Sequence, residues 1–180
     1  MCKNFSGQIL LTDHNKLKDP VNAIKKLIKN SIFILRREHN LDLNKLKELR
    51  SLCRKQKIYF FVQEIKLAYL LKADGLSIKE HDLALPRANL QKKFYIIASC
   101  HNFRAAKLAE KNKDNYILYS PIFDSSSHRN IRGLGRIKFN IQTRFLRSKI
   151  VALGGIKQKN ISLLNNLNIC GFAAIDYFVS

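Results

Sequence analysis

Short apolar runs rich in Ile, Phe and Tyr recur eight times along the chain. The runs lack strict alternation of apolar and polar residues, which is typical of strands buried on both faces. They occupy residues 8–12, 32–35, 58–62, 75–78, 94–98, 116–119, 149–153 and 171–175. This recurrence limits the fold more than any other feature of the sequence.

Segments with Leu, Ile and Ala at three- and four-residue spacing follow five of the runs, as expected for amphipathic helices. These segments span residues 21–29, 43–55, 65–72, 102–111 and 157–167. Alternating strands and helices imply a parallel sheet, and eight units favour a closed barrel. We therefore predict an α/β fold, a (βα)8 TIM-type barrel forming a single domain over residues 1–180. An open sheet is the alternative.

The length of the chain indicates a compact version of this fold. A typical (βα)8 barrel has about 250 residues, whereas this sequence ends at Ser180, just beyond the eighth apolar run. We expect the final helix to be truncated or missing. The connection at residues 81–93 is also short, and we expect only a turn or two of helix there, interrupted at Pro86.

Charge and cysteine content restrict the partners and the compartment. Lys and Arg number 33 against 13 acidic residues, a formal net charge of +20 that favours phosphates, nucleic acid or anionic lipid. The basic residues are dispersed, so charge alone does not predict a dedicated nucleic-acid-binding protein. The four cysteines form no C-x-x-C pair, and no apolar stretch reaches the length of a signal peptide core or membrane helix. We expect a cytoplasmic protein with no membrane partner.

Candidate phosphate-binding residues follow the sixth and seventh runs. Gly154 and Gly155 precede a predicted helix, where backbone N–H groups can hold a phosphate, although the pair is equally compatible with a tight turn. Residues 120–136 combine hydroxyls, arginines and glycines, which suits a polyanion but also a solvated loop. The candidates in that segment are Ser125, Ser127, Arg132 and Gly133.

The fifth run ends beside a candidate proton-transfer group. His101 could exchange protons near neutral pH, or it could simply cap or pack the next helix. Its neighbour Cys100 points to the other side of a strand, and we expect it to be a core thiol rather than a nucleophile.

Several motifs in order resemble the thiamine phosphate synthase and TenI family, from about residue 10 to residue 178. They are Lys-Ala-Asp-Gly at 72–75, Asp82, Ser-Cys-His at 99–101, Ser-Pro-Ile-Phe at 120–123, Gly-Gly-Ile at 154–156 and Gly-Phe-Ala at 171–173. The resemblance implies a (βα)8 barrel. It also implies an enzyme that joins a hydroxymethylpyrimidine pyrophosphate to a thiazole phosphate and releases pyrophosphate with the help of Mg²⁺.

The resemblance assigns roles to individual residues. Arg37 matches the arginine after strand two, Ser99 the serine of strand five, and Asp82 a magnesium-binding acid. The remaining matches are the two threonines of the pyrophosphate loop at Ser125 and Ser127, and the thiazole-phosphate glycines at Gly154 and Gly155.

The sequence also departs from the family pattern, so we expect a divergent active site. Val62 and Gln63 replace an Asn-Asp pair, and Asp176 stands where a serine is found. An unpaired carboxylate at 176 would repel a phosphate. A TenI-like thiazole phosphate tautomerase using His101 is therefore one alternative, and a non-catalytic barrel that binds a phosphometabolite or nucleic acid is another. The sequence is also compatible with a homo-oligomer.

Overall fold

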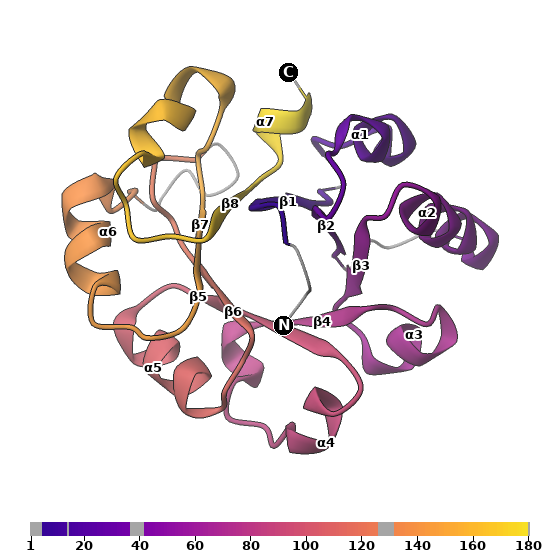
Figure 1. Ribbon diagram of the computed structural model, residues 1–180, viewed down its shortest axis with the longest axis horizontal. Helices are drawn as coiled ribbons and strands as arrows, with labels where there is room; N and C mark the ends of the chain where they lie inside the picture. Colours follow the sequence, from indigo (N-terminus) through magenta and orange to yellow (C-terminus); the bar gives the residue numbers. More distant parts are fainter. Residues whose placement is uncertain (1–4, 14, 37–41, 126–131, 180) are drawn as a thin grey trace.

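Eight parallel strands close into a barrel in the computed structural model, and the helices form a ring around it (Figure 1). The structure describes residues 5–13, 15–36, 42–125 and 132–179. The strands are β1 (Gln8–Leu11), β2 (Ile32–Leu35), β3 (Tyr59–Val62), β4 (Gly75–Ile78), β5 (Tyr95–Cys100), β6 (Tyr116–Tyr119), β7 (Ile150–Leu153) and β8 (Gly171–Ala174). In β1, Ile9 lies opposite Ile32 of β2 and Ala173 of β8, which closes the barrel. The prediction of a closed (βα)8 barrel is confirmed.

The helical segments follow the strands in order. They are α1 (Pro20–Lys26), α2 (Leu43–Lys55), α3 (Ile65–Leu70), η1 (Glu80–Asp82), α4 (Ala88–Gln91), α5 (Phe103–Lys111), α6 (Gly135–Thr143), η2 (Gln158–Leu164) and α7 (Asp176–Val179). Side chains at the helix starts explain two of these boundaries, because Asp19 accepts a hydrogen bond from the Asn22 backbone N–H and Asn102 accepts one from Ala105. Two details differ from the sequence prediction: η2 is a 3₁₀ helix, and α6 was not predicted.

The strands bury side chains on both faces. Alternate residues point into the barrel and form one apolar cluster, while their neighbours point outward and pack beneath the helices in a second, larger cluster. The inner cluster contains Ile9, Leu11, Ile32, Ile34, Phe61, Ile97, Tyr116, Leu118, Val151 and Ala173. The barrel is therefore a packed core, and ligands can be expected only at its ends.

Gly75 of β4 leaves room for the side chain of Phe61, the residue that β3 contributes to this inner cluster. A Cβ atom at position 75 would lie 2.1 Å from Cε1 of Phe61, far closer than nonbonded carbon atoms approach. The missing side chain thus allows the Phe61 ring to fill the middle of the barrel.

The connection after β4 is short, as expected, and a buried ion pair anchors it. The Nε and Nη2 atoms of Arg87 each lie 2.9 Å from a carboxylate oxygen of Asp114, whose side chain is fully buried. The Nη1 atom donates to the carbonyls of Leu83 and Leu85 at 3.0 and 3.1 Å. Arg87 therefore ties the segment that carries η1 to the start of β6.

The last described helix, α7, has four residues. It lies beside α1 in the ring, and three aromatic residues pack there: Phe172, Tyr177 and Phe178 (Figure 1). Within the described part of the chain, no helix is both long enough and apolar enough to cross a membrane.

Candidate functional site

The carboxyl ends of the strands, which we call the rim, carry Ser99, His101, Gly154 and Gly155. Ser99 is two residues after Ile97 on β5, and Ile97 belongs to the inner cluster. The strand period of two therefore places Ser99 on the inward face near the rim, where it is half-buried.

His101 is held at the rim by residues of two other segments. Its ring Nδ1 lies 3.0 Å from the Oγ atom of Ser120, whose side chain is buried. Its backbone N–H donates to a carboxylate oxygen of Glu80 at 2.6 Å, and the Asn102 side chain donates to the other oxygen of Glu80 at 2.6 Å. Because Ser120 occupies Nδ1, the Nε2 atom is the ring nitrogen available to a ligand.

Cys100 is a core thiol, as predicted. It is fully buried on the outer face of β5, and burial raises the pKa of its thiol to about 12. A thiol with so high a pKa is almost entirely protonated at neutral pH, so it is a poor nucleophile.

The two glycines after β7 lie against the segment after β6. We call residues 120–124 the rim segment. The backbone N–H groups of Ile122 and Phe123 donate to the carbonyls of Leu153 and Gly154 at 2.9 and 3.1 Å. A Cβ atom on Gly155 would meet the Asp124 carbonyl oxygen at 2.3 Å. The space left by the missing side chain is therefore filled by the backbone of the rim segment.

The glycine pair still offers donors to an anion. Gly154 and Gly155 have φ angles of +107° and +65°, in the region that favours glycine. Within the described residues, the backbone N–H groups of these two glycines donate to no acceptor. The Gly155 carbonyl accepts a hydrogen bond from Asn160 at 2.9 Å, which fixes the turn before η2.

The two ends of the loop between β6 and α6, which we call the serine-rich loop, are close together. The Asp124 side chain accepts a hydrogen bond from the Gly133 backbone N–H at 2.7 Å, which brings Arg132 and Gly133 back to the rim segment. Ser125 is half-buried and Arg132 is exposed. Two predicted site residues, Ser127 of this loop and Arg37 after β2, lie outside the described residues.

Asp176 does not stand as an unpaired charge. The Lys16 Nζ atom lies 2.9 and 3.2 Å from its two carboxylate oxygens, and the Lys157 Nζ atom lies at 4.0 Å. The side chains of Lys16 and Asp176 are about one-quarter exposed, so water screens this pair only partly. Two lysines around one carboxylate leave a net positive environment, and one of them, Lys157, stands two residues beyond Gly155.

Asp82 is the least integrated of the predicted site residues. It lies on η1, its carboxylate is 3.4 Å from the His81 ring, and no hydrogen bond between described residues joins that carboxylate to His101 or the rim segment. Among the described residues, no group of three His, Cys, Asp or Glu side chains could hold a metal ion. The residues therefore do not form a preassembled magnesium site.

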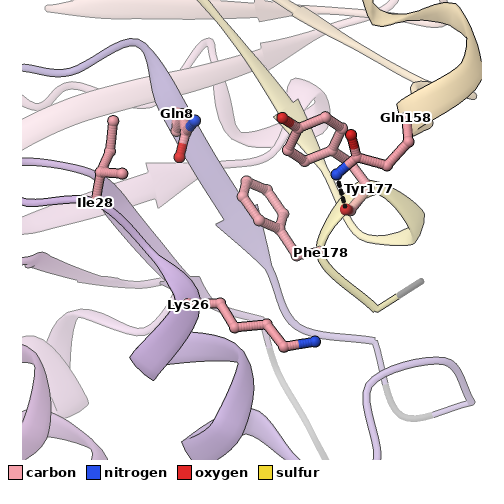
Figure 2. Close-up of a pocket in the computed structure, with 6 residues that line it drawn as sticks. All are labelled: Gln8, Lys26, Ile28, Gln158, Tyr177 and Phe178. Carbon is pink, nitrogen blue, oxygen red and sulfur yellow. Dashed lines mark hydrogen bonds between the residues drawn. The ribbon is translucent and has the colours of Figure 1, made fainter.

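A cavity of about 210 Å³ lies away from these residues. Figure 2 shows its lining, which comes from the start of β1, the end of α1, η2 and α7. A hydrogen bond of 3.3 Å from the Gln158 side chain to the Tyr177 carbonyl crosses one side. Gln8 lies at the start of β1, whereas the rim is formed by the carboxyl ends of the strands. The cavity therefore lies between α7 and α1 and does not belong to the rim of β5, β6 and β7.

The structure thus brings together part of the predicted set. Ser120 contacts His101, and the following residues of the rim segment contact Gly154 and Gly155, so the ends of β5, β6 and β7 form one continuous region. Sequence reasoning missed Glu80 and Ser120 as members of this region, and it missed Lys16 as the partner of Asp176. Ser120 stood within a quoted motif, but its partner on β5 could be found only from the strand order.

Comparisons with known proteins point to one family. The family model described as "Thiamine monophosphate synthase" matches residues 9–178. A "Thiamine-phosphate synthase" of Fusobacterium nucleatum is 24% identical, with 95% of this chain and 88% of that protein covered. One of Thermoplasma acidophilum is also 24% identical, with 99% and 87% covered.

A solved structure shows the same fold. The thiamine phosphate pyrophosphorylase of Pyrococcus furiosus superimposes with a TM-score of 0.77 at 22% identity, covering 95% of this chain and 89% of that one. The family model covers nearly the whole barrel, from β1 to α7, and includes the rim residues described above. The chain therefore belongs to the thiamine monophosphate synthase family.

Proposed function

We propose that this protein joins a hydroxymethylpyrimidine pyrophosphate to a thiazole phosphate and releases pyrophosphate. The observation that carries the proposal is the family match over residues 9–178, which takes in the contiguous rim of β5, β6 and β7. In this reaction, a bond forms between the thiazole nitrogen and the pyrimidine methylene carbon. The bond from that carbon to the pyrophosphate oxygen breaks, and the pyrophosphate leaves with the electron pair.

The glycine turn is the proposed site of the thiazole phosphate. Gly154 and Gly155 supply two backbone N–H donors, and Lys16 and Lys157 add positive charge close by. Donors fixed by the backbone lose no side-chain freedom when they bind an anion, so they hold it in a defined position.

The serine-rich loop is the proposed site of the pyrophosphate. Its charge grows as the carbon–oxygen bond breaks, so donors that face it stabilise the transition state more than the ground state. Ser125 supplies a hydroxyl and Arg132 a guanidinium, and Gly133 brings backbone close to the same place. Arg37 and Ser127 complete the proposed set. Mg²⁺, when bound, would neutralise pyrophosphate charge in such a reaction.

A second candidate function is a TenI-like thiazole phosphate tautomerase. The observation that favours it is the 3.0 Å contact between Ser120 and the Nδ1 atom of His101, which leaves Nε2 to take and return a proton. Such a reaction needs the phosphate site and His101, but no pyrophosphate site.

One pair of assays distinguishes the two functions. The purified protein is given both substrates with Mg²⁺, and pyrophosphate release and thiamine phosphate are measured, with an excess of chelator as the metal control. In parallel, the thiazole carboxylate phosphate alone is incubated in D₂O, and proton exchange is followed by NMR. Pyrophosphate release that Arg132→Gln reduces and His101→Asn spares would support the synthase. Exchange without pyrophosphate release, abolished by His101→Asn, would replace it with the tautomerase.

A further inference from the structure

Helix α6 is apolar on two opposite sides. Phe139 and Thr143 face the core and are fully buried. On the opposite side, Ile137 and Ile141 of α6, and Phe145 in the turn just beyond its end, recur at four-residue spacing and are 80%, 50% and 59% exposed. The solvent side of a helix in a globular protein is normally polar, so three large apolar residues in one exposed row need an explanation. We call this row the α6 stripe; helix α6 itself belongs to the outer ring of helices (Figure 1).

Cations border the α6 stripe on both sides. Arg136 and Lys138 flank Ile137 and are exposed, and the Arg144 guanidinium lies 4.5 Å from the centre of the Phe145 ring. No acidic residue occurs in the sequence between Asp124 and Asp176. The surface of this part of the chain therefore carries a positive charge with an apolar centre.

A carboxylate close to the end of the α6 stripe is already paired, because Lys107 donates both to Glu110 and to the Phe145 carbonyl. Glu110 of α5 accepts hydrogen bonds from the Lys107 side chain and from the backbone N–H groups of Arg147 and Ser148. These contacts outweigh the effect of burial and hold the pKa of Glu110 below its usual range, so the carboxylate stays ionised and paired. It does not offset the exposed cations around the α6 stripe.

We propose that the α6 stripe docks onto an anionic lipid surface, a peripheral membrane contact that departs from our expectation of no membrane partner. Anionic headgroups would meet the cations, and the apolar boundary below them would take up Ile137, Ile141 and Phe145. A second copy of this chain would bring like charges together across a twofold interface. A nucleic acid would satisfy the cations but leave the three apolar side chains without a suitable partner. This inference is independent of the proposed catalytic function.

The test is binding to sedimented vesicles, with and without phosphatidylglycerol in phosphatidylcholine. We expect binding only to the phosphatidylglycerol vesicles, weakened by salt. The combined variant Ile137→Ser, Ile141→Ser and Phe145→Ser should bind about tenfold or more weakly, because apolar burial is lost. The matched control carries Ile65→Ser, Tyr69→Ser and Leu70→Ser on α3, where the same number of exposed apolar residues is removed; it should bind like the parent.

A second measurement does not depend on affinity. The chain has no Trp, so Phe145→Trp introduces a single reporter whose emission should shift to shorter wavelength on phosphatidylglycerol vesicles. Equal losses in the α6 and α3 variants would overturn the proposal and leave unspecific apolar adsorption. The absence of an emission shift would also overturn it and leave unspecific charge attraction. A dimer in solution that the α6 variant converts to a monomer would also overturn it, in favour of a second copy. The proposal would also be overturned if the parent protein bound no vesicles but bound an acidic protein, and if the α6 variant lost that binding.

Discussion

Replacing Arg87 by Met should destabilise the protein more than any surface charge change. The substitution leaves the buried Asp114 carboxylate with one described side-chain partner, Gln91 at 3.2 Å, in place of the two 2.9 Å contacts from Arg87. It also removes the donor to the carbonyls of Leu83 and Leu85. Removing one partner of a buried ion pair costs about 3–5 kcal/mol, a large part of the 5–15 kcal/mol that stabilises a typical domain.

The size of the effect can be measured by urea and thermal unfolding. For a chain of this length, about 1 kcal/mol corresponds to about 2–4 °C, so Arg87→Met should lower the melting temperature by about 10 °C. The control is Lys45→Gln, because Lys45 and Glu48 form an exposed pair worth about 0–1 kcal/mol. The double variant Arg87→Met with Asp114→Leu should recover much of the loss, since no charge is then left buried.

The outcome also bears on the rim. Arg87 holds the segment that carries Glu80, and Glu80 accepts hydrogen bonds from the backbone of His101 and the side chain of Asn102. We therefore expect faster amide exchange at residues 80–87 in the Arg87→Met variant, even under conditions where the barrel stays folded. A loss of stability no larger than that of Lys45→Gln would refute the reasoning.

Three further substitutions test the glycine turn, the contact of Ser120 with His101 and the pairing of Glu110. Gly155→Ala should cost more than 2 kcal/mol in urea unfolding, because its Cβ would meet the Asp124 carbonyl, whereas Gly135→Ala, also at positive φ but with open space, should cost about 1 kcal/mol; equal losses would contradict the packing argument. Ser120→Ala should change the tautomer of His101 seen by ¹⁵N NMR and slow any proton exchange about tenfold, without weakening phosphate binding. Glu110→Gln should destabilise by about 1–2 kcal/mol at neutral pH. Because the folded pKa of Glu110 is lowered, that stability is present above the unfolded pKa near 4.3 and is lost as the pH falls through the folded value; a pH-independent difference would contradict this account.

The strands could be predicted well because burial on both faces leaves a strong local pattern. All four residues of β2 are buried, and the run at 32–35 has only apolar residues. α6 escaped prediction for a physical reason: Phe139 faces the core and Ile137 and Ile141 face outward, so the segment shows no single apolar stripe. The 3₁₀ geometry of η2 depends on how its ends are held, as by the hydrogen bond from Asn160 to Gly155, and periodicity does not show this.

The site could be predicted only in part. Gly154, Gly155 and the residues after β6 were identified, and the closed barrel places them side by side. The contact of Ser120 with His101 joins residues 19 positions apart, and the pairing of Lys16 with Asp176 joins residues 160 positions apart. Such partners follow from the closure of β1 onto β8 and from strand order, so no local motif could reveal them.

The fit of Phe61 over Gly75 couples two positions that are neighbours across β3 and β4. A methyl group at 75 has no room while the ring is present, and a smaller residue at 61 leaves a void while the glycine is present. Either single change is therefore harmful, whereas the paired change is tolerable. Descendants of this chain should keep both residues or exchange both, and members of the family that carry alanine at the equivalent of 75 should lack an aromatic ring at the equivalent of 61.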